Sequence, residues 1–255
     1  MTLIRAVLFD YGETLVVAKN RGDRVFQDAV RPVFDVLRAQ GLRMGYTEFV
    51  ERDMEVYGRY ARLEKAEQRD LPDGPKSEEL VAAVLPALSV SRRRRVAREA
   101  NDAFWRVIAE SYRLRVGTKP ALKQLKQMGI RMAVISNHHN GRALRGHLDE
   151  LAISSYFSKV VVSSELAYRK PDPRIFRKCL AALGVAGRES VFVGDSLVND
   201  IAGAKAMGML AVLIVKPHRE VEASPVAPDY TVRDLREVPK IVNRFSEESL
   251  GHPRT

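Results

Sequence analysis

The sequence predicts an α/β protein in which a Rossmann-like parallel sheet, with helices on both faces, is joined to a bundle of helices. Three observations support this fold class. Short apolar runs alternate with helical segments from residue 118 onward, which is the order of a parallel sheet. Another apolar run, residues 6–9, lies near the start of the chain and ends abruptly in an acid. Between residues 20 and 113 the apolar residues recur at helical spacing, and no strand signal of weight interrupts them.

Each predicted strand is a short apolar run, as expected of strands that are buried on both faces of a sheet. The first of them ends at Asp10 and the second at Ser136. The expected strands are residues 6–9, 132–135, 160–162, 191–193 and 210–215, with a weaker one near residue 230. The helices expected with them are residues 118–128, 143–151, 173–183, 201–207 and 234–245.

Four helices are expected between the first strand and residue 113. Ser77 and Ser91 are the expected N-caps of the last two, and the run Leu71–Pro75 is expected to separate the second helix from the third. The apolar stripes of these helices favour a small bundle with its own core. The chain therefore divides into an α/β core of residues 1–16 and 114–246, a helical domain of residues 17–113 and a polar tail of residues 247–255.

The composition favours a globular protein of the cytoplasm. Apolar residues make up 45% of the chain, and the apolar run Met209–Val215 is far too short to span a membrane. The N-terminal apolar run is too short for a signal peptide. The single cysteine, Cys179, excludes an intramolecular disulfide and is expected to be a small core residue.

The net charge of +10 favours anionic partners. The arginine run 92–95 falls in a predicted helix, where successive residues turn by about 100°, so it forms no single basic stripe. We therefore favour a small phosphorylated metabolite over nucleic acid, and expect no membrane partner. A monomer and a homodimer both fit the sequence.

Polar residues with related chemistry follow several of the predicted strands. Asp10 follows the first strand, and Asp195 and Asp200 follow the strand at residues 191–193. Parallel strands bring their carboxyl ends to one edge of a sheet, so these acids are expected to converge with Ser136 and with Lys170. Carboxylates that lie close together need a cation, and ligands that are all oxygen favour Mg²⁺. A lysine and a hydroxyl beside them are suited to phosphoryl transfer, with Asp10 as the nucleophile.

Four motifs in this order resemble those of the haloacid dehalogenase-like (HAD) hydrolase superfamily. They are Phe9-Asp10-Tyr11-Gly12-Glu13-Thr14-Leu15, Val134-Ile135-Ser136-Asn137, Lys170-Pro171-Asp172 and Gly194-Asp195-Ser196-Leu197-Val198-Asn199-Asp200. The resemblance covers nearly the whole chain. It implies that the helical domain is a cap, which lies after the first motif, closes over the site and selects the substrate.

The resemblance also implies the roles of individual residues. Asp10 corresponds to a nucleophile that takes the phosphoryl group as an aspartyl-phosphate, and Lys170 to the lysine that neutralises charge beside it. Ser136 and Asn137 correspond to the groups that hold the transferred phosphoryl. The implied Mg²⁺ ligands are Asp10, Asp195 and the backbone carbonyl of Gly12, with support from Asp200.

One position departs from the family's pattern. Phosphatases of this superfamily usually carry a second Asp two residues after the nucleophile, which protonates the leaving oxygen and then activates water. Gly12 stands there in this chain. General acid–base help typically contributes about 10²–10⁴-fold, so roughly that much is missing unless another group supplies it. Glu13 is expected to face elsewhere, whereas His138, next to the second motif, is a candidate for substrate contact or for the missing acid.

Three functions are compatible with this departure. The first is a Mg²⁺-dependent phosphatase in which a cap residue, water or the substrate supplies the proton. The second is a phosphonatase-type hydrolase of C–P bonds, which would need a cap lysine to form an imine; the candidates are Lys19, Lys65 and Lys76. The third is a phosphate-responsive binding protein with low turnover. A haloacid dehalogenase proper is disfavoured, because those enzymes need no metal and the acids here are suited to one.

Overall fold

A computed structural model describes residues 3–19, 24–215 and 225–249 of the chain. Its centre is a six-stranded sheet in the order β5-β4-β1-β6-β7-β8, and every neighbouring pair is parallel. The predicted fold class is therefore confirmed. The strands are β1 (Ala6–Phe9), β4 (Arg131–Ser136), β5 (Lys159–Val162), β6 (Ser190–Gly194), β7 (Leu210–Ile214) and β8 (Tyr230–Val232).

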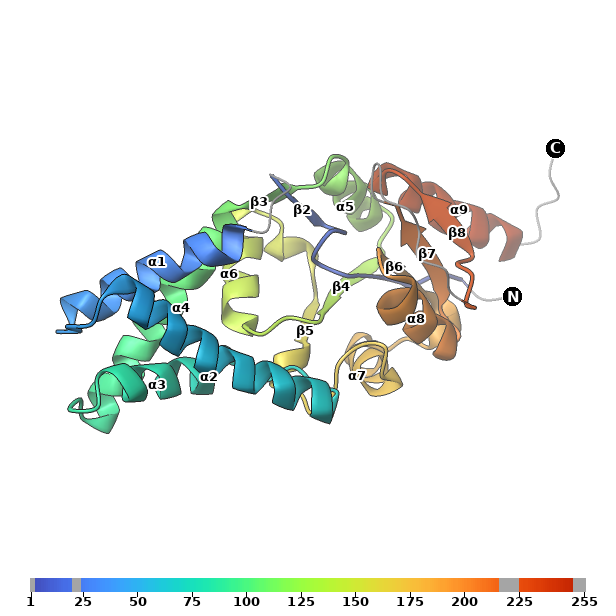
Figure 1. Ribbon diagram of the computed structural model, residues 1–255. Coiled ribbons are helices and arrows are strands. Elements are labelled where there is room, and N and C mark those ends of the chain that lie inside the picture. The colour runs from blue at the N-terminus through green and yellow to red at the C-terminus, as the bar shows by residue number, and fades with distance from the viewer. Residues whose placement is uncertain (1–2, 20–23, 216–224, 250–255) are drawn as a thin grey trace.

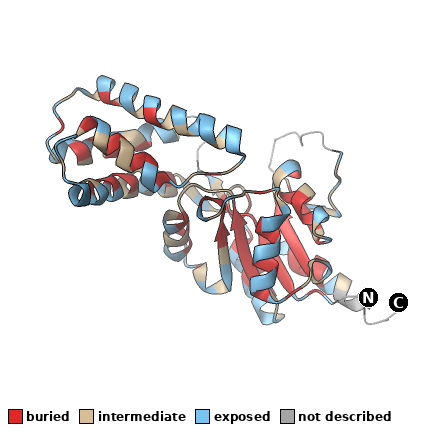
Figure 2. Cartoon of the chain, turned by 90° about the horizontal axis from the view of Figure 1, so that it is seen from below, coloured by how far each residue is buried: buried red, intermediate tan, exposed pale blue. Residues whose placement is uncertain are grey.

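The strands alternate their side chains between two apolar layers. Val7 and Phe9 of β1 pack with helices on one face, and Ala6 and Leu8 pack with helices on the other. Because both layers are apolar, the strands are buried on both sides, and Figure 2 shows the sheet as the most buried part of the molecule. The first face carries α5 (Thr118–Gln127), α6 (Gly141–Glu150) and α9 (Val238–Ser249), and the second carries α7 (Pro173–Leu183) and α8 (Ala202–Ala206).

A helical insert made of α1 to α4 extends to one side of the sheet (Figure 1). It is packed around a separate apolar cluster that includes Leu37, Phe49, Leu80 and Val96. This cluster is what the helical spacing of the apolar residues predicts, while the domain boundaries drawn from the sequence stay a prediction. The helices are α1 (Arg24–Ala39), α2 (Tyr46–Glu67), α3 (Asp73–Val84) and α4 (Val90–Glu110).

Two helix starts differ from the prediction. Helix α3 begins four residues before Ser77, with Pro72 as its N-cap, because a proline such as Pro75 is tolerated in the first helical turn. Helix α4 is capped by Ser89 instead of Ser91, and the Ser89 hydroxyl accepts a hydrogen bond from the backbone N–H of Arg92 at 3.4 Å. Two serines at i and i+2 offer alternative caps, and the earlier one is used.

A short antiparallel ribbon, missed in the sequence, links the insert to the core. It pairs β2 (Val16–Ala18) with β3 (Tyr112–Leu114), which lie where the chain leaves the core and returns to it. Strands of three residues are too short to give a periodic signal. At the other end of the chain α9 continues to Ser249, past the predicted end at Phe245. The rest of the predicted polar tail, residues 250–255, lies outside the described residues.

Two predictions from composition can be compared with the structure. Cys179 is fully buried among apolar residues of α7 and the sheet. Within residues 3–19, 24–215 and 225–249, no helix is both long and apolar enough to cross a membrane.

Candidate active site

The carboxyl edge of the sheet brings together the acids and the lysine singled out in the sequence. Asp10 directly follows β1, Asp195 follows β6, and Asp200 lies in the helical turn Leu197–Ile201 that comes next. The Lys170 Nζ donates hydrogen bonds to Asp10 Oδ1 at 2.6 Å and to Asp200 Oδ1 at 2.7 Å. The side chains of Lys170 and Asp200 are each only 2% exposed, so this contact is shielded from water.

Burial decides the electrostatics of this cluster. Burial raises the pKa of Asp10 to about 7; the Lys170 ammonium opposes this rise, and the neighbouring carboxylates of Asp200 and Asp195 add to it. For Lys170, burial lowers the pKa, but Asp10 and Asp200 outweigh burial and raise it above its ordinary value. The lysine is therefore held in its charged form between two acids.

The acidic cluster fits a hard divalent cation. One carboxylate oxygen from each of Asp10, Asp195 and Asp200 lies within 4.8 Å of the others. Three carboxylates beside one ammonium leave an excess of negative charge, and the repulsion from Asp200 and Asp195 adds to the rise in the pKa of Asp10 that burial causes. Mg²⁺ prefers oxygen ligands, so the donor set is suited to the predicted metal. The backbone carbonyl of Gly12 stays a predicted ligand.

Asn137 holds the backbone of Lys170 at two points. Its Nδ2 donates to the Lys170 carbonyl at 3.0 Å, and its Oδ1 accepts from the Lys170 N–H at 2.8 Å. This pair of bonds between the loop after β4 and the loop before α7 fixes where the lysine enters the site. The Asn137 amide is thus engaged with protein. The predicted phosphate-binding role of Ser136 and Asn137 then depends on the Ser136 hydroxyl and on backbone N–H groups.

Arg115, which the sequence reasoning missed, anchors the loop that follows the nucleophile. Its Nε donates to the Thr14 carbonyl at 3.1 Å and its Nη2 to the Glu13 carbonyl at 2.5 Å. The Glu13 carboxylate accepts from the backbone N–H of Ala18 at 3.2 Å and does not line the cavity at the site. The expectation that Glu13 faces elsewhere is therefore confirmed.

A cavity of about 340 Å³ lies between the insert and the carboxyl edge of the sheet. Asp10, Gly12 and Ser136 form its floor on the core side, and Phe26 and Trp105 reach it from α1 and α4. The remaining lining residues are Tyr11, Ile108, Ala109, Tyr112, Asn137, His138, His139, Ala143, Leu144 and His147. The cavity is therefore shared by core and insert, which is where a substrate could meet both.

His138 lies in the cavity wall, but its environment does not suit an acid. The ring is 4.4 Å from the ring of Trp105 between centroids, and its Nδ1 accepts from the backbone N–H of Asn140 at 3.0 Å. Burial lowers the pKa of His138 to about 4, helped by the neighbouring His139. The ring is neutral at pH 7 with its proton on Nε2, so it can donate a hydrogen bond to a substrate far more readily than a proton.

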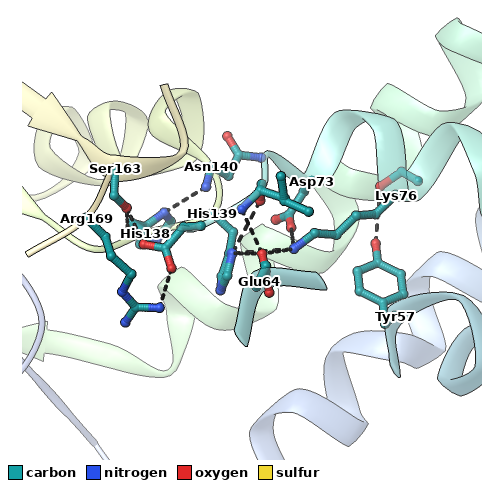
Figure 3. A network of polar contacts seen from close by, with 12 residues as sticks. Tyr57, Glu64, Asp73, Lys76, His138, His139, Asn140, Ser163 and Arg169 are labelled. Atoms are coloured by element: carbon teal, nitrogen blue, oxygen red, sulfur yellow. Dashed lines mark hydrogen bonds and ion pairs between the residues drawn. The ribbon is translucent and has the colours of Figure 1, made fainter. Parts of the chain in front are cut away.

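Polar contacts between the insert and the core lie near the end of α2 and the start of α3 (Figure 3). Glu64 accepts from Lys76 Nζ at 2.8 Å and lies 3.1 Å from the Nδ1 of His139. Asp70, just before α3, accepts from the hydroxyl of Ser163 and from Arg169 Nη1 at 2.6 Å. These contacts hold the insert against the loops that carry His139 and Lys170.

Replacing Asp70 by asparagine is expected to lower the free energy of unfolding by about 1–3 kcal/mol, because a buried charge-assisted contact is lost. The Asp70 side chain is 3% exposed. Asp102 offers a matched control, since it pairs with Arg142 across the same boundary but is 41% exposed. Asp102→Asn should cost less than about 0.5 kcal/mol. Urea denaturation of both variants measures the difference, and equal losses would contradict the assignment.

The fold and the position of the site define the class of protein: a Rossmann-like α/β protein with a charged site at the carboxyl edge of its sheet and a helical insert after the first strand. The chain belongs to the haloacid dehalogenase-like hydrolases, because the model of that family matches residues 4–208. The predicted family is therefore confirmed, and the protein is a hydrolase.

Several curated relatives are similar in sequence. A phosphoserine phosphatase of Thermus thermophilus is 36% identical over 142 residues, which cover 56% of this chain and 56% of the relative. A glyceraldehyde 3-phosphate phosphatase of Methanopyrus kandleri is 26% identical over 96% of this chain and 100% of the relative. The first similarity thus spans about half of that phosphatase, and the second spans a whole one.

Solved structures support the fold. A 2-haloacid dehalogenase from Pseudomonas syringae superposes with a TM-score of 0.72 at 21% identity, over 95% of this chain and 100% of the other. A HAD phosphatase from Thermococcus onnurineus gives 0.61 at 23% identity, over 99% of this chain and 100% of the other. Both have the same fold as this chain, although one is described as a dehalogenase and the other as a phosphatase.

Proposed function

We propose that the protein is a Mg²⁺-dependent phosphatase that acts on a small phosphorylated metabolite through an aspartyl-phosphate on Asp10. The observation that carries the proposal is the buried contact of Lys170 with Asp10 and Asp200, beside a third acid, Asp195. The names of the relatives, which include phosphoserine and glyceraldehyde 3-phosphate phosphatases, support the same class of reaction.

In the proposed reaction an Asp10 carboxylate oxygen attacks the phosphorus of the ester. The bond to the ester oxygen breaks, and the alcohol leaves with a proton taken from solvent. Lys170 opposes the rise in the pKa of Asp10 that burial causes and positions the carboxylate, and its charge offsets the negative charge around the transferred phosphoryl group. Water then attacks the aspartyl-phosphate, which releases inorganic phosphate and restores the carboxylate.

Magnesium, when bound, would supply further positive charge to the phosphoryl oxygens and to the attacking carboxylate. Asp10, Asp195 and the Gly12 carbonyl would hold it, with Asp200 in support. The Ser136 hydroxyl, which is buried in the cavity floor, would hold a phosphoryl oxygen. These groups would contact the phosphoryl end of the substrate, and the alcohol end would lie in the rest of the cavity.

The phosphonatase alternative lacks a lysine in the right place among the described residues. Lys65 is exposed on α2, Lys19 is exposed and donates to the Glu110 carbonyl at 2.6 Å, and Lys76 pairs with Glu64 and with Asp73. None of the three lines the cavity. The phosphatase is therefore the function that the geometry favours.

Phosphate release from a panel of metabolite esters, measured with Mg²⁺ and with a chelator, tests the proposal. We expect release with Mg²⁺ and a loss of at least about tenfold under chelation, since the metal contributes several kcal/mol to charge stabilisation. Calorimetric titration with Mg²⁺ adds a readout that is independent of activity, and Asp195→Asn should weaken binding. Binding of Mg²⁺ and a phosphoryl mimic without any turnover would favour the binding-protein alternative instead.

A further inference from the structure

The described residues that line the cavity carry no fixed positive charge. Among its lining residues, all of which lie in the described part of the chain, there is neither a lysine nor an arginine, and Asp10 is the only acid. The two histidines whose titration is perturbed are both shifted toward the neutral form: burial lowers the pKa of His138 to about 4 and also lowers the pKa of His147. The described wall opposite Asp10 therefore offers no lysine or arginine to an anionic leaving group, and the third lining histidine, His139, lies 3.1 Å from the Glu64 carboxylate.

Two polar groups of the aromatic walls, those of Trp105 and Tyr11, are engaged by the protein itself. The Trp105 Nε1–H donates to Asp73 Oδ2 at 2.7 Å, which fixes the indole ring. The Tyr11 hydroxyl shares a hydrogen bond with Nδ1 of His147, and both side chains are buried. Because these two polar groups are already hydrogen-bonded, Trp105 and Tyr11 present mainly the surface of their rings to a ligand.

One aromatic side chain lies in the cavity lining without being covered. Phe26 of α1 is 61% exposed, which is unusual for a large apolar residue, and its ring is 6.3 Å from that of Phe104 between centroids. An exposed aromatic beside an aromatic cavity is a typical sign of a ligand-binding surface. Together, Phe26, Trp105 and Tyr112 supply aromatic groups to the cavity from the insert and from the ribbon strand β3.

Cavity walls of this kind favour esters whose alcohol part is uncharged over esters whose alcohol part carries a carboxylate. An uncharged aromatic group gains about 25 cal/mol for each Å² of apolar surface that it buries there. A carboxylate at the same place gives up part of its hydration and finds no lysine or arginine among the described lining residues in return, which is costly. Leaving groups such as serine or glycolate, each of which carries a carboxylate, are therefore poorly matched to this cavity.

We propose that the substrate is a phosphate monoester of an uncharged aromatic alcohol or phenol, with its phosphoryl group at Asp10 and its ring between Phe26 and Trp105. This inference rests on the proposed phosphatase function. It also agrees with Gly12, since a phenolic oxygen is a better leaving group than an alkoxide and depends less on an acid at that position.

The test compares two substrates that differ in one charge, benzyl phosphate and 4-carboxybenzyl phosphate, with saturating Mg²⁺. Their leaving oxygens are chemically alike, so a difference in kcat/KM reports on the cavity. We expect benzyl phosphate to be preferred by at least about tenfold, from the cost of an unpaired carboxylate. Equal rates, or a preference for the carboxylate, would overturn the inference.

Two variants locate the effect in the cavity. Phe26→Ala should lower kcat/KM for benzyl phosphate several-fold more than that for phosphoglycolate, while Met54→Ala should change neither, because Met54 is 68% exposed and does not line the cavity. Ala109→Lys should raise the relative rate for 4-carboxybenzyl phosphate by supplying the missing cation. If neither variant shifts the preference, the ring binds elsewhere and the inference fails.

The two proposals fail in different ways. If esters are hydrolysed through Asp10 but the carboxylated substrate is equally good, only the substrate class is wrong. If no ester is hydrolysed at all, or if Asp10→Asn has the same activity as the unaltered protein, the phosphatase proposal is wrong and the substrate class falls with it.

Discussion

Replacing Asp10 by asparagine is expected to lower kcat for phosphate release by about 10⁴-fold or more, because the amide oxygen cannot form the covalent intermediate. The same change is expected to leave the free energy of unfolding unchanged or to raise it. In the native protein burial raises the pKa of Asp10 to about 7, and repulsion by Asp200 and Asp195 adds to this rise while Lys170 opposes it. Asparagine removes that repulsion, while Lys170 keeps its contact with Asp200.

Measuring both quantities separates chemistry from folding. A loss of kcat with an unchanged or increased melting temperature is the result expected if Asp10 is placed for reaction at a cost to stability. Asp229→Asn provides a control, since Asp229 pairs with Lys205 on the surface and lies outside the cavity. Turnover by Asp10→Asn above about 1% of the unaltered rate would contradict a covalent role, given the size of nucleophile effects.

The convergence of the acids and the lysine could be predicted from the sequence because it follows from topology. Asp10 and Asp195 directly follow neighbouring parallel strands, β1 and β6, so a shared edge brings them together whatever the details of packing. Short apolar runs bounded by turn residues were enough to place those strands. The contact of Lys170 with Asp10 and Asp200 agrees with the resemblance stated from the motifs.

Other features of the site depend on contacts between distant segments and leave no local signal. The amide of Asn137 holds the backbone of Lys170, and Arg115 holds two carbonyls of the loop after Asp10. Phe26 and Trp105 lie on helices whose apolar spacing is equally typical of residues in the core of a bundle. Only the way the insert lies on the sheet shows that Phe26 and Trp105 line the cavity instead.

Gly12→Asp is expected to raise kcat for alkyl phosphates by about 10²–10⁴-fold, which is the usual contribution of a general acid and base. The structure leaves room for this change. A Cβ at Gly12 would meet no atom within 4 Å, and the φ angle of the residue lies outside the left-handed region, so an aspartate is accommodated without strain. Gly12 also lines the cavity beside Asp10, where the new carboxyl could reach the leaving oxygen.

The gain should depend on the leaving group, and this dependence distinguishes the missing acid from other effects of the substitution. Benzyl phosphate, which releases an alkoxide-like oxygen, should gain the full factor, whereas phenyl phosphate should gain much less because phenoxide leaves without help. Gly12→Asn introduces a side chain of nearly the same size that cannot transfer a proton, so it should give no gain with either ester.

Equal gains for both esters would show that aspartate acts through binding or metal affinity, and no gain would mean that proton transfer to the leaving group does not limit turnover. A gain confined to benzyl phosphate would instead indicate that the unaltered site depends on esters whose alcohols leave easily, and the lack of an acid at residue 12 would then help to select the substrate.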